Sequence, residues 1–166
     1  MERIAELGEL HPGRKPIQPP RAELRRFYKA ARAVLKHPLL TFGDDEIERI
    51  GDSFAQVVAE RKYTCYACAI MPDHVHALIR KHRDRAEAMI DHLQKASRQQ
   101  SIAEGRRAPT HPVWGSPGWK VFLYRHDDFL RVSDYIRKNP VKAGRPPQFW
   151  GFVKGYDGWL PGQYAR

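Results

Sequence analysis

The chain has 166 residues, which is enough for one domain with a hydrophobic core and too few for two. Its 29 Lys and Arg against 19 Asp and Glu give a formal net charge of +10, which favours a polyanionic partner such as nucleic acid. No stretch approaches the ~18 consecutive apolar residues of a membrane span, so we expect a cytoplasmic protein with no membrane contact.

The excess positive charge lies in the second part of the chain. Residues 1–60 contain ten basic and ten acidic side chains, whereas residues 61–166 contain 19 and nine. A merely soluble basic protein fits this composition equally well. The two cysteines, Cys65 and Cys68, are too few for a disulfide framework or a structural zinc site, so we expect both to be buried as small apolar residues.

The N-terminal part is expected to be an arm followed by two helices. Pro and Gly are too dense in residues 11–20 for regular structure, and residues 21–37 then carry apolar side chains at helical spacing. A further helix is predicted over residues 44–60, because acidic residues suit a helix N terminus and the apolar residues share one face. That face consists of Ile47, Ile50, Phe54, Val57 and Val58.

A hairpin of two strands is predicted over residues 63–70 and 74–80. The first strand is apolar at both odd and even positions, which is typical of a strand covered on both faces. In the second strand the side chains alternate between faces. Val75, Ala77 and Ile79 take the face expected to meet the core, and His74, His76 and Leu78 take the other.

His74 and His76 are therefore neighbours, roughly 6.5 to 7 Å apart along the strand. Two imidazoles at this spacing can bind one metal ion between them. Histidines that each bond to backbone or water are the commoner case, so the motif alone is weak and needs a third ligand.

The rest of the chain is predicted to contain a helix, a loop, a strand and a helix. The first helix covers residues 84–104, with a core stripe, and residues 109–118 read as a loop. Residues 119–125 alternate as a strand does, and the last helix ends near Asn139, because Pro140 disfavours helical geometry at the residue before it. The two helices have core stripes of Ala86, Met89, Ile90, Leu93 and Ala96, and of Phe129, Val132 and Ile136.

Tyr135 lies about 100° round the last helix from Ile136, at the edge of its apolar stripe. Its helical neighbours are Arg131, Lys138 and Asn139. A tyrosine among cations and a carboxamide is placed to use its hydroxyl in chemistry. A boundary tyrosine whose hydroxyl reaches water has the same pattern.

Two stretches together resemble a known family. MPDHVHALI (71–79) and YIRKNPVKAG (135–144), with GWKVFL (118–123) between them, are similar to the REP-associated tyrosine transposases, which are single-tyrosine HUH (His-hydrophobic-His) endonucleases. The resemblance covers roughly residues 42–145. It implies an α+β fold with a ferredoxin-like antiparallel sheet and helices packed on one face, to which this chain adds an N-terminal helix.

The resemblance also implies an arrangement of domains. Residues 1–41 would form the arm and helix, residues 42–145 the catalytic domain, and residues 146–166 an aromatic and Gly-rich segment packed on it. The strand with which family members usually open is not found before the first helix.

The resemblance assigns roles to four residues. His74, His76 and, as candidate third ligand, Asn139 would bind a divalent metal, Mg²⁺ or Mn²⁺, and Tyr135 would be the nucleophile. The implied reaction is metal-dependent nicking and strand transfer of single-stranded DNA at hairpin sites through a 5′-phosphotyrosine intermediate. The implied setting is a bacterial, nucleoid-associated protein that acts as a monomer or homodimer.

Basic residues and one tryptophan of the second part are candidates for contacts to the DNA backbone and bases. They are Arg80, Lys95, Arg98, Arg131, Lys138, Lys142 and Trp119. The alternative is a non-catalytic or domesticated hairpin DNA-binding protein on the same fold. A zinc hydrolase or deaminase is disfavoured, because no His-x-Glu accompanies a Pro-Cys-x-x-Cys.

Overall fold

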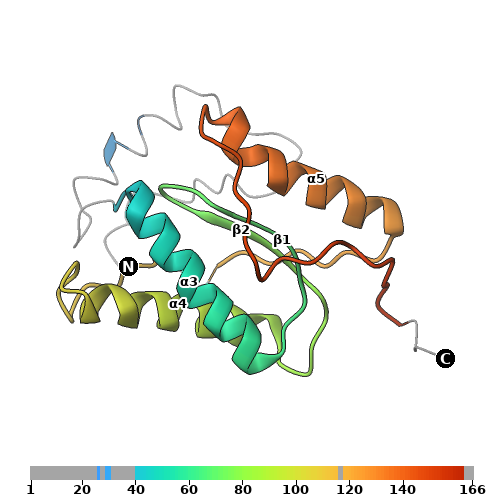
Figure 1. Cartoon of the computed structure of the whole chain (residues 1–166), viewed down its shortest axis with the longest axis horizontal. Helices are drawn as coiled ribbons and strands as arrows, with labels where there is room; N and C mark the ends of the chain where they lie inside the picture. Colours follow the sequence, from blue (N-terminus) through green and yellow to red (C-terminus); the bar gives the residue numbers. More distant parts are fainter. Residues whose placement is uncertain (1–25, 27–28, 31–39, 116–117, 163–166) are drawn as a thin grey trace. The chain divides into compact units, whose positions relative to one another are not determined.

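A computed structural model describes residues 26, 29–30, 40–115 and 118–162 (Figure 1). The chain divides into two compact units, Met1–Leu40 and Thr41–Arg166. In the first unit Arg26, Lys29 and Ala30 are helical. The rest of the helix predicted over residues 21–37, and the arm predicted over residues 11–20, lie outside the described residues.

The second unit is α+β (Figure 1). Its helices are α3 (Asp44–Arg61), α4 (Ala86–Ala103) and α5 (His126–Lys142), and its strands are β1 (Cys65–Ile70) and β2 (Val75–Ile79). The two strands pair as an antiparallel hairpin. The predictions of the helices near 44–60 and 84–104, and of the hairpin, are confirmed.

Helix α3 is favoured both by the residues at its two ends and by its apolar face. Three acidic residues occupy its first turn, and the Glu46 carboxylate accepts a hydrogen bond from the Gly43 N–H at 3.2 Å. The helix stops at Lys62, which has a left-handed φ of 59°. Its predicted apolar face is buried in full, and α3 packs on α4 and β1.

Strand β1 is buried at all six positions, as the sequence predicts for a strand covered on both faces. Cys65 and Cys68 are both free and buried, which confirms that they serve as small apolar residues. A register irregularity between Cys65 and Ala67 lets Tyr66 and Ala67 enter the same core cluster.

The sheet face that carries His76 is covered by α5. The core cluster on this face contains Tyr66, Ala67, Ala69, Leu78, Phe129 and Ile136. The prediction that Val75, Ala77 and Ile79 face the core is wrong in this respect, because Leu78 is buried and Ala77 is exposed. Figure 1 shows α5 on one side of the hairpin and α3 and α4 on the other. The expectation that all helices pack on one face is therefore wrong.

Two further predictions about the region before and within α5 are wrong. Residues 119–125 form no strand, because no other segment of the described chain pairs with their backbone. Helix α5 does not end near Asn139 but continues through Pro140 to Lys142. Pro140 lies in the last turn, so its missing N–H removes one bond only, and the Ala143 N–H donates to the Asn139 and Pro140 carbonyls.

The outer edge of β1 is covered by residues 148–154. The Gln148 side chain binds both backbone groups of Ile70, donating to the carbonyl at 2.7 Å and accepting from the N–H at 2.9 Å. The Lys154 N–H donates to the Cys65 carbonyl at 2.8 Å, beside a parallel bridge between Cys65 and Val153. In the part of the chain that is described, no helix is long and apolar enough to cross a membrane.

Candidate active site

The site is built where β2 begins and where α5 crosses the same sheet face. His76 pairs with Ala69 across the hairpin, and Ala69 belongs to the core cluster under α5. This register turns the His76 ring toward α5 rather than toward α3. The docking of Phe129 and Ile136 beside Leu78 then fixes where the next turn of α5 stands.

The two histidine rings are adjacent. The ring centroids of His74 and His76 are 4.8 Å apart, with the rings 76° from parallel. A metal-bound imidazole nitrogen lies ~2 Å from the ion, so two rings that share one ion have centroids roughly 4.5 to 5 Å apart. Edge-to-face ring pairs have similar spacing, so a further observation is needed to favour a ligand pair.

Asp73 supplies that observation. Its carboxylate accepts a hydrogen bond from Nδ1 of His74 at 2.7 Å. A carboxylate on one ring nitrogen fixes the tautomer and leaves the lone pair of the other nitrogen, Nε2, available to a metal. The Asp73–His74 pair therefore has the arrangement that surrounds many metal-bound histidines.

His76 is held in the form that binds metals. Burial, and then the proximity of His74, lower the pKa of His76 from its usual value. A lowered pKa keeps the imidazole neutral at physiological pH, and only a neutral nitrogen can be a ligand. His76 is half-buried, whereas the side chain of His74 is 46% exposed.

Tyr135 lies next to His76. The ring centroids are 5.7 Å apart, with the rings 73° from parallel, and the tyrosine is 49% exposed. The Lys142 ammonium lies 5.3 Å from the centroid of the Tyr135 ring, two helical turns further along α5. The structure therefore brings His74, His76 and Tyr135 together in one continuous row of rings.

Asn139 is half-buried and follows Tyr135 by one turn of α5. The described residues contain no group of three His, Cys, Asp or Glu side chains that could hold a metal ion. Asn139, whose carboxamide oxygen can bind a metal, is not one of these residue types and stays a candidate ligand. Water and phosphate oxygens would complete the coordination of Mg²⁺ or Mn²⁺ at such a site, and imidazole ligands also suit Zn²⁺ or Ni²⁺.

Most of the predicted DNA-contacting cations are engaged within the protein. Lys95 pairs with Asp91 at 2.8 Å. Arg131 pairs with Asp128 at 2.8 Å, and Lys138 pairs with Asp134 at 2.9 Å. These exposed pairs are weak, so they lower the availability of the three cations without removing it.

Two of the predicted contacts have structural roles. Arg98 on α4 donates to the carbonyls of Pro109 and His111, which fastens the following loop to the helix. Arg80 pairs with Asp157 at 3.5 Å and lies over the Trp159 ring at 4.6 Å, which ties the C-terminal segment to the end of β2. The remaining two predicted contacts, Lys142 and Trp119, are in positions suited to binding a ligand. Lys142 lies beside Tyr135, and Trp119 has 74% of its surface exposed.

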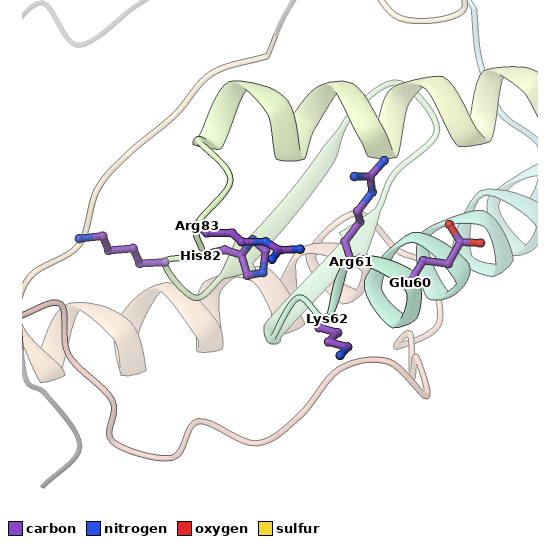
Figure 2. Close-up of a pocket in the computed structure, with 6 residues that line it drawn as sticks. Glu60, Arg61, Lys62, His82 and Arg83 are labelled. Atoms are coloured by element: carbon purple, nitrogen blue, oxygen red, sulfur yellow. The ribbon is translucent and has the colours of Figure 1, made fainter.

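Two features were not identified from the sequence. No role is assigned to Asp73 from the sequence, although an acidic residue directly before His74 is a signal for a partner of that ring. The second is a concave surface of about 560 Å³, here named the basic hollow (Figure 2). It is lined by Glu60, Arg61, Lys62, Lys81, His82 and Arg83.

No protein-family model, no curated protein and no solved structure matches this chain.

Proposed function

We propose that this protein is a metal-dependent enzyme that nicks single-stranded DNA at hairpin sites and transfers the cut strand, with Tyr135 as nucleophile. The observation that carries the proposal is the contact between Tyr135 on α5 and His76 on β2, next to a His74 ring oriented by Asp73. A phenol, two adjacent imidazoles and a carboxamide are the groups that this reaction needs.

In the proposed reaction the Tyr135 hydroxyl oxygen attacks a backbone phosphorus. The bond between phosphorus and the 3′-oxygen breaks, the 3′-oxygen takes up a proton, and the 5′-phosphate stays joined to the tyrosine. Because half of the Tyr135 side chain is exposed, its own proton can pass directly to water. The number of phosphoester bonds is unchanged, so a later 3′-hydroxyl can reverse the step and join a new strand.

The residues around Tyr135 contribute in distinct ways. Lys142 places a positive charge near the Tyr135 ring, where it can attract a phosphate of the bound strand. His74, His76 and Asn139 would hold the metal, which when bound would offset the negative charge of the phosphodiester. The ring contact with His76 fixes where Tyr135 stands relative to that position.

The finer fold belongs to the same proposal. The order helix, strand, strand, helix, helix, with the last helix over the histidine face, supports a ferredoxin-like HUH arrangement. The described sheet has only two strands, and a ferredoxin-like sheet has more. The proposal therefore requires further strands beyond the described helices and strands.

The test is a search for a covalent adduct. Purified protein is incubated with labelled single-stranded oligonucleotides that carry hairpins, with Mn²⁺ or Mg²⁺, and run on denaturing gels. We expect an adduct that disappears with chelator and in Tyr135→Phe, and that persists in Tyr124→Phe, a matched exposed tyrosine. Hairpin binding with no adduct under either metal would reject the enzyme and favour a DNA-binding protein.

A further inference from the structure

The basic hollow lies at the opposite end of the hairpin from the candidate active site. His74 precedes the first residue of β2, whereas Lys81 and Arg83 follow its last residue, Ile79. The five residues of β2 span roughly 13 Å from Val75 to Ile79. The hollow is therefore separate from the Tyr135 site, yet on the same small unit.

The pairing of the hairpin explains why the hollow exists. Cys65 pairs with Ile79, and the Arg80 N–H donates to the Thr64 carbonyl at 2.9 Å. If this antiparallel register is continued past the strand ends, the positions of Lys62 and His82 face each other. Two short basic stretches that are separated in sequence, 61–62 and 81–83, are thereby brought together. Figure 2 shows Arg61 and Lys62 across the hollow from His82 and Arg83, with the Arg61 and Lys62 side chains pointing in opposite directions and Glu60 on the side remote from His82 and Arg83.

The four cations of the hollow differ from most others in the protein. Arg106 and Arg107 bind Asp45 and Glu46, and Arg145 binds Asp44. Within the described part of the chain, no carboxylate lies within ion-pair distance of any of the hollow's cations, which are Arg61, Lys62, Lys81 and Arg83. Four cations against one lining carboxylate leave an excess of positive charge in this concavity, and that excess attracts an anion.

The wall of the hollow that contains His82 is held in place by contacts within the protein. The Tyr63 hydroxyl donates to Asp84 at 2.8 Å, and the Asp84 N–H donates to Nδ1 of His82 at 3.2 Å. The Tyr63 and His82 rings meet edge to face, with centroids 4.9 Å apart. Asp84 is the second carboxylate near the hollow, and Tyr63 already engages it. The position of His82, and with it the shape of this wall, is set without a ligand.

The character of the lining indicates the class of ligand. Small-molecule sites are enclosed and mostly apolar. The basic hollow is open, and every lining residue ends in a charged or imidazole group, so it does not enclose a compact metabolite. Spaced phosphates on a chain that continues in both directions fit such a surface.

We propose that the basic hollow binds the sugar-phosphate backbone of the DNA strand, as a second contact remote from Tyr135. This inference rests on the proposed function for the identity of the polymer. The hollow would contribute affinity and the salt dependence of binding. It would leave the chemical step at Tyr135 unaffected once the DNA is bound.

The test compares two pairs of substitutions within the hollow with one matched pair outside it. Arg61→Gln with Arg83→Gln, and separately Lys62→Gln with Lys81→Gln, each remove two charges from the hollow. Arg49→Gln with Lys154→Gln removes two charges from exposed positions elsewhere. Thermal melts establish that each protein is folded. Binding of a labelled hairpin-bearing single-stranded oligonucleotide is then measured by anisotropy over a range of salt concentrations.

We expect the slope of log K against log salt to fall in magnitude by about 1.4 in each hollow variant, because each phosphate contact on a single strand contributes ~0.7. The Kd at ~0.1 M salt should rise by about tenfold, with little change in the control pair. Slopes in both hollow variants equal to that of the control would overturn the inference.

Adduct formation at saturating DNA separates this inference from the proposed function. If the wild-type protein forms an adduct and the hollow variants bind as the control does, only the hollow is rejected. If no adduct forms but the slopes fall as expected, the hollow stands and the enzyme is rejected. A wild-type protein that binds no DNA overturns both.

Discussion

The ring of His76 on β2 meets the ring of Tyr135 on α5 edge to face, with centroids 5.7 Å apart. This contact is made by tertiary packing alone, because the two residues belong to elements that are separated by α4 and the loop after it. It places a potential nucleophile beside a potential metal ligand, and Asp73 then orients the second ligand, His74. The geometry of this row of side chains has consequences that can be measured separately.

Asp73→Asn should weaken metal binding without abolishing it. The amide oxygen can still accept from Nδ1 of His74, but without the charge that makes the ring a stronger ligand. We expect the Kd for Mn²⁺, measured by calorimetry, to rise by about tenfold or more, in line with other second-layer partners of metal-bound histidines. Asp52→Asn, at an exposed carboxylate on α3, is the control. Equal Mn²⁺ affinities in the two variants would show that Asp73 does not support a metal ligand.

The elements that carry this site could largely be predicted from local sequence. The apolar spacing in α3 and the apolar β1 followed by a short break determine their own structure, since helix and strand periods are local. The face of β2 that meets the core was not predictable in the same way. Both faces of β2 carry apolar residues, and the packing of α5 over Leu78 decides between them.

Other features depend on partners that a sequence pattern does not contain. Residues 119–125 alternate like a strand, but a strand also needs a neighbouring backbone, and none pairs with this segment in the described part of the structure. By contrast, the pairing of Lys95, Arg131 and Lys138 with acidic neighbours one turn away on the same helix follows from helical spacing and is predictable from sequence. The basic hollow depends on the hairpin register, which joins two short basic stretches.

Gly51→Ala should destabilise the protein, although alanine is the better helix former. A Cβ at Gly51 would lie 2.7 Å from Cε3 and 2.8 Å from Cη2 of Trp150, and would also meet Cζ3. The indole would have to move, which would loosen the segment that covers β1. Overpacking of this kind costs about 1–3 kcal/mol and exceeds the ~1 kcal/mol that alanine gains in a helix. The check is urea unfolding. Gly155→Ala, where an added Cβ meets no atom within 4 Å, should change little, and equal stabilities would show that Trp150 adapts freely.

Tyr66→Phe should lower the free energy of unfolding at neutral pH, and the decrease should be smaller at acid pH. Burial, then the hydrogen bond to Asp157, raise the pKa of Tyr66 to about 12, and the same bond is the main cause that lowers the pKa of Asp157. The Tyr66 hydroxyl donates to Oδ1 of Asp157 at 2.7 Å. Because the folded pKa of Asp157 is depressed, its stabilisation is present above the unfolded value of ~3.9 and is lost as the pH falls through the folded value.

The measurement for Tyr66→Phe is the free energy of unfolding in urea at pH 7 and at successively lower pH. We expect the variant to be less stable than the wild type by about 1 kcal/mol at pH 7. The difference should shrink as the pH falls below ~3.9. A difference that stays constant across this range would mean that the Asp157 charge contributes nothing through Tyr66. Tyr124→Phe, at a tyrosine that is 69% exposed, is the control.

Trp119→Ala should weaken the binding of single-stranded DNA more than the loss of another exposed aromatic ring does. Trp119 is 74% exposed in the segment before the start of α5, and Phe122 and Tyr124 in the same segment are also exposed. Covering an exposed indole removes its apolar surface from water and is therefore favourable, and unpaired bases stack on such rings. Removal of one stacking ring costs ~1–3 kcal/mol of binding free energy, so the Kd should rise by roughly tenfold. Phe149→Ala removes a ring that is 88% exposed and lies outside this segment, and its Kd should be unchanged. Equal Kd values in the two variants would exclude Trp119 as a base-stacking residue.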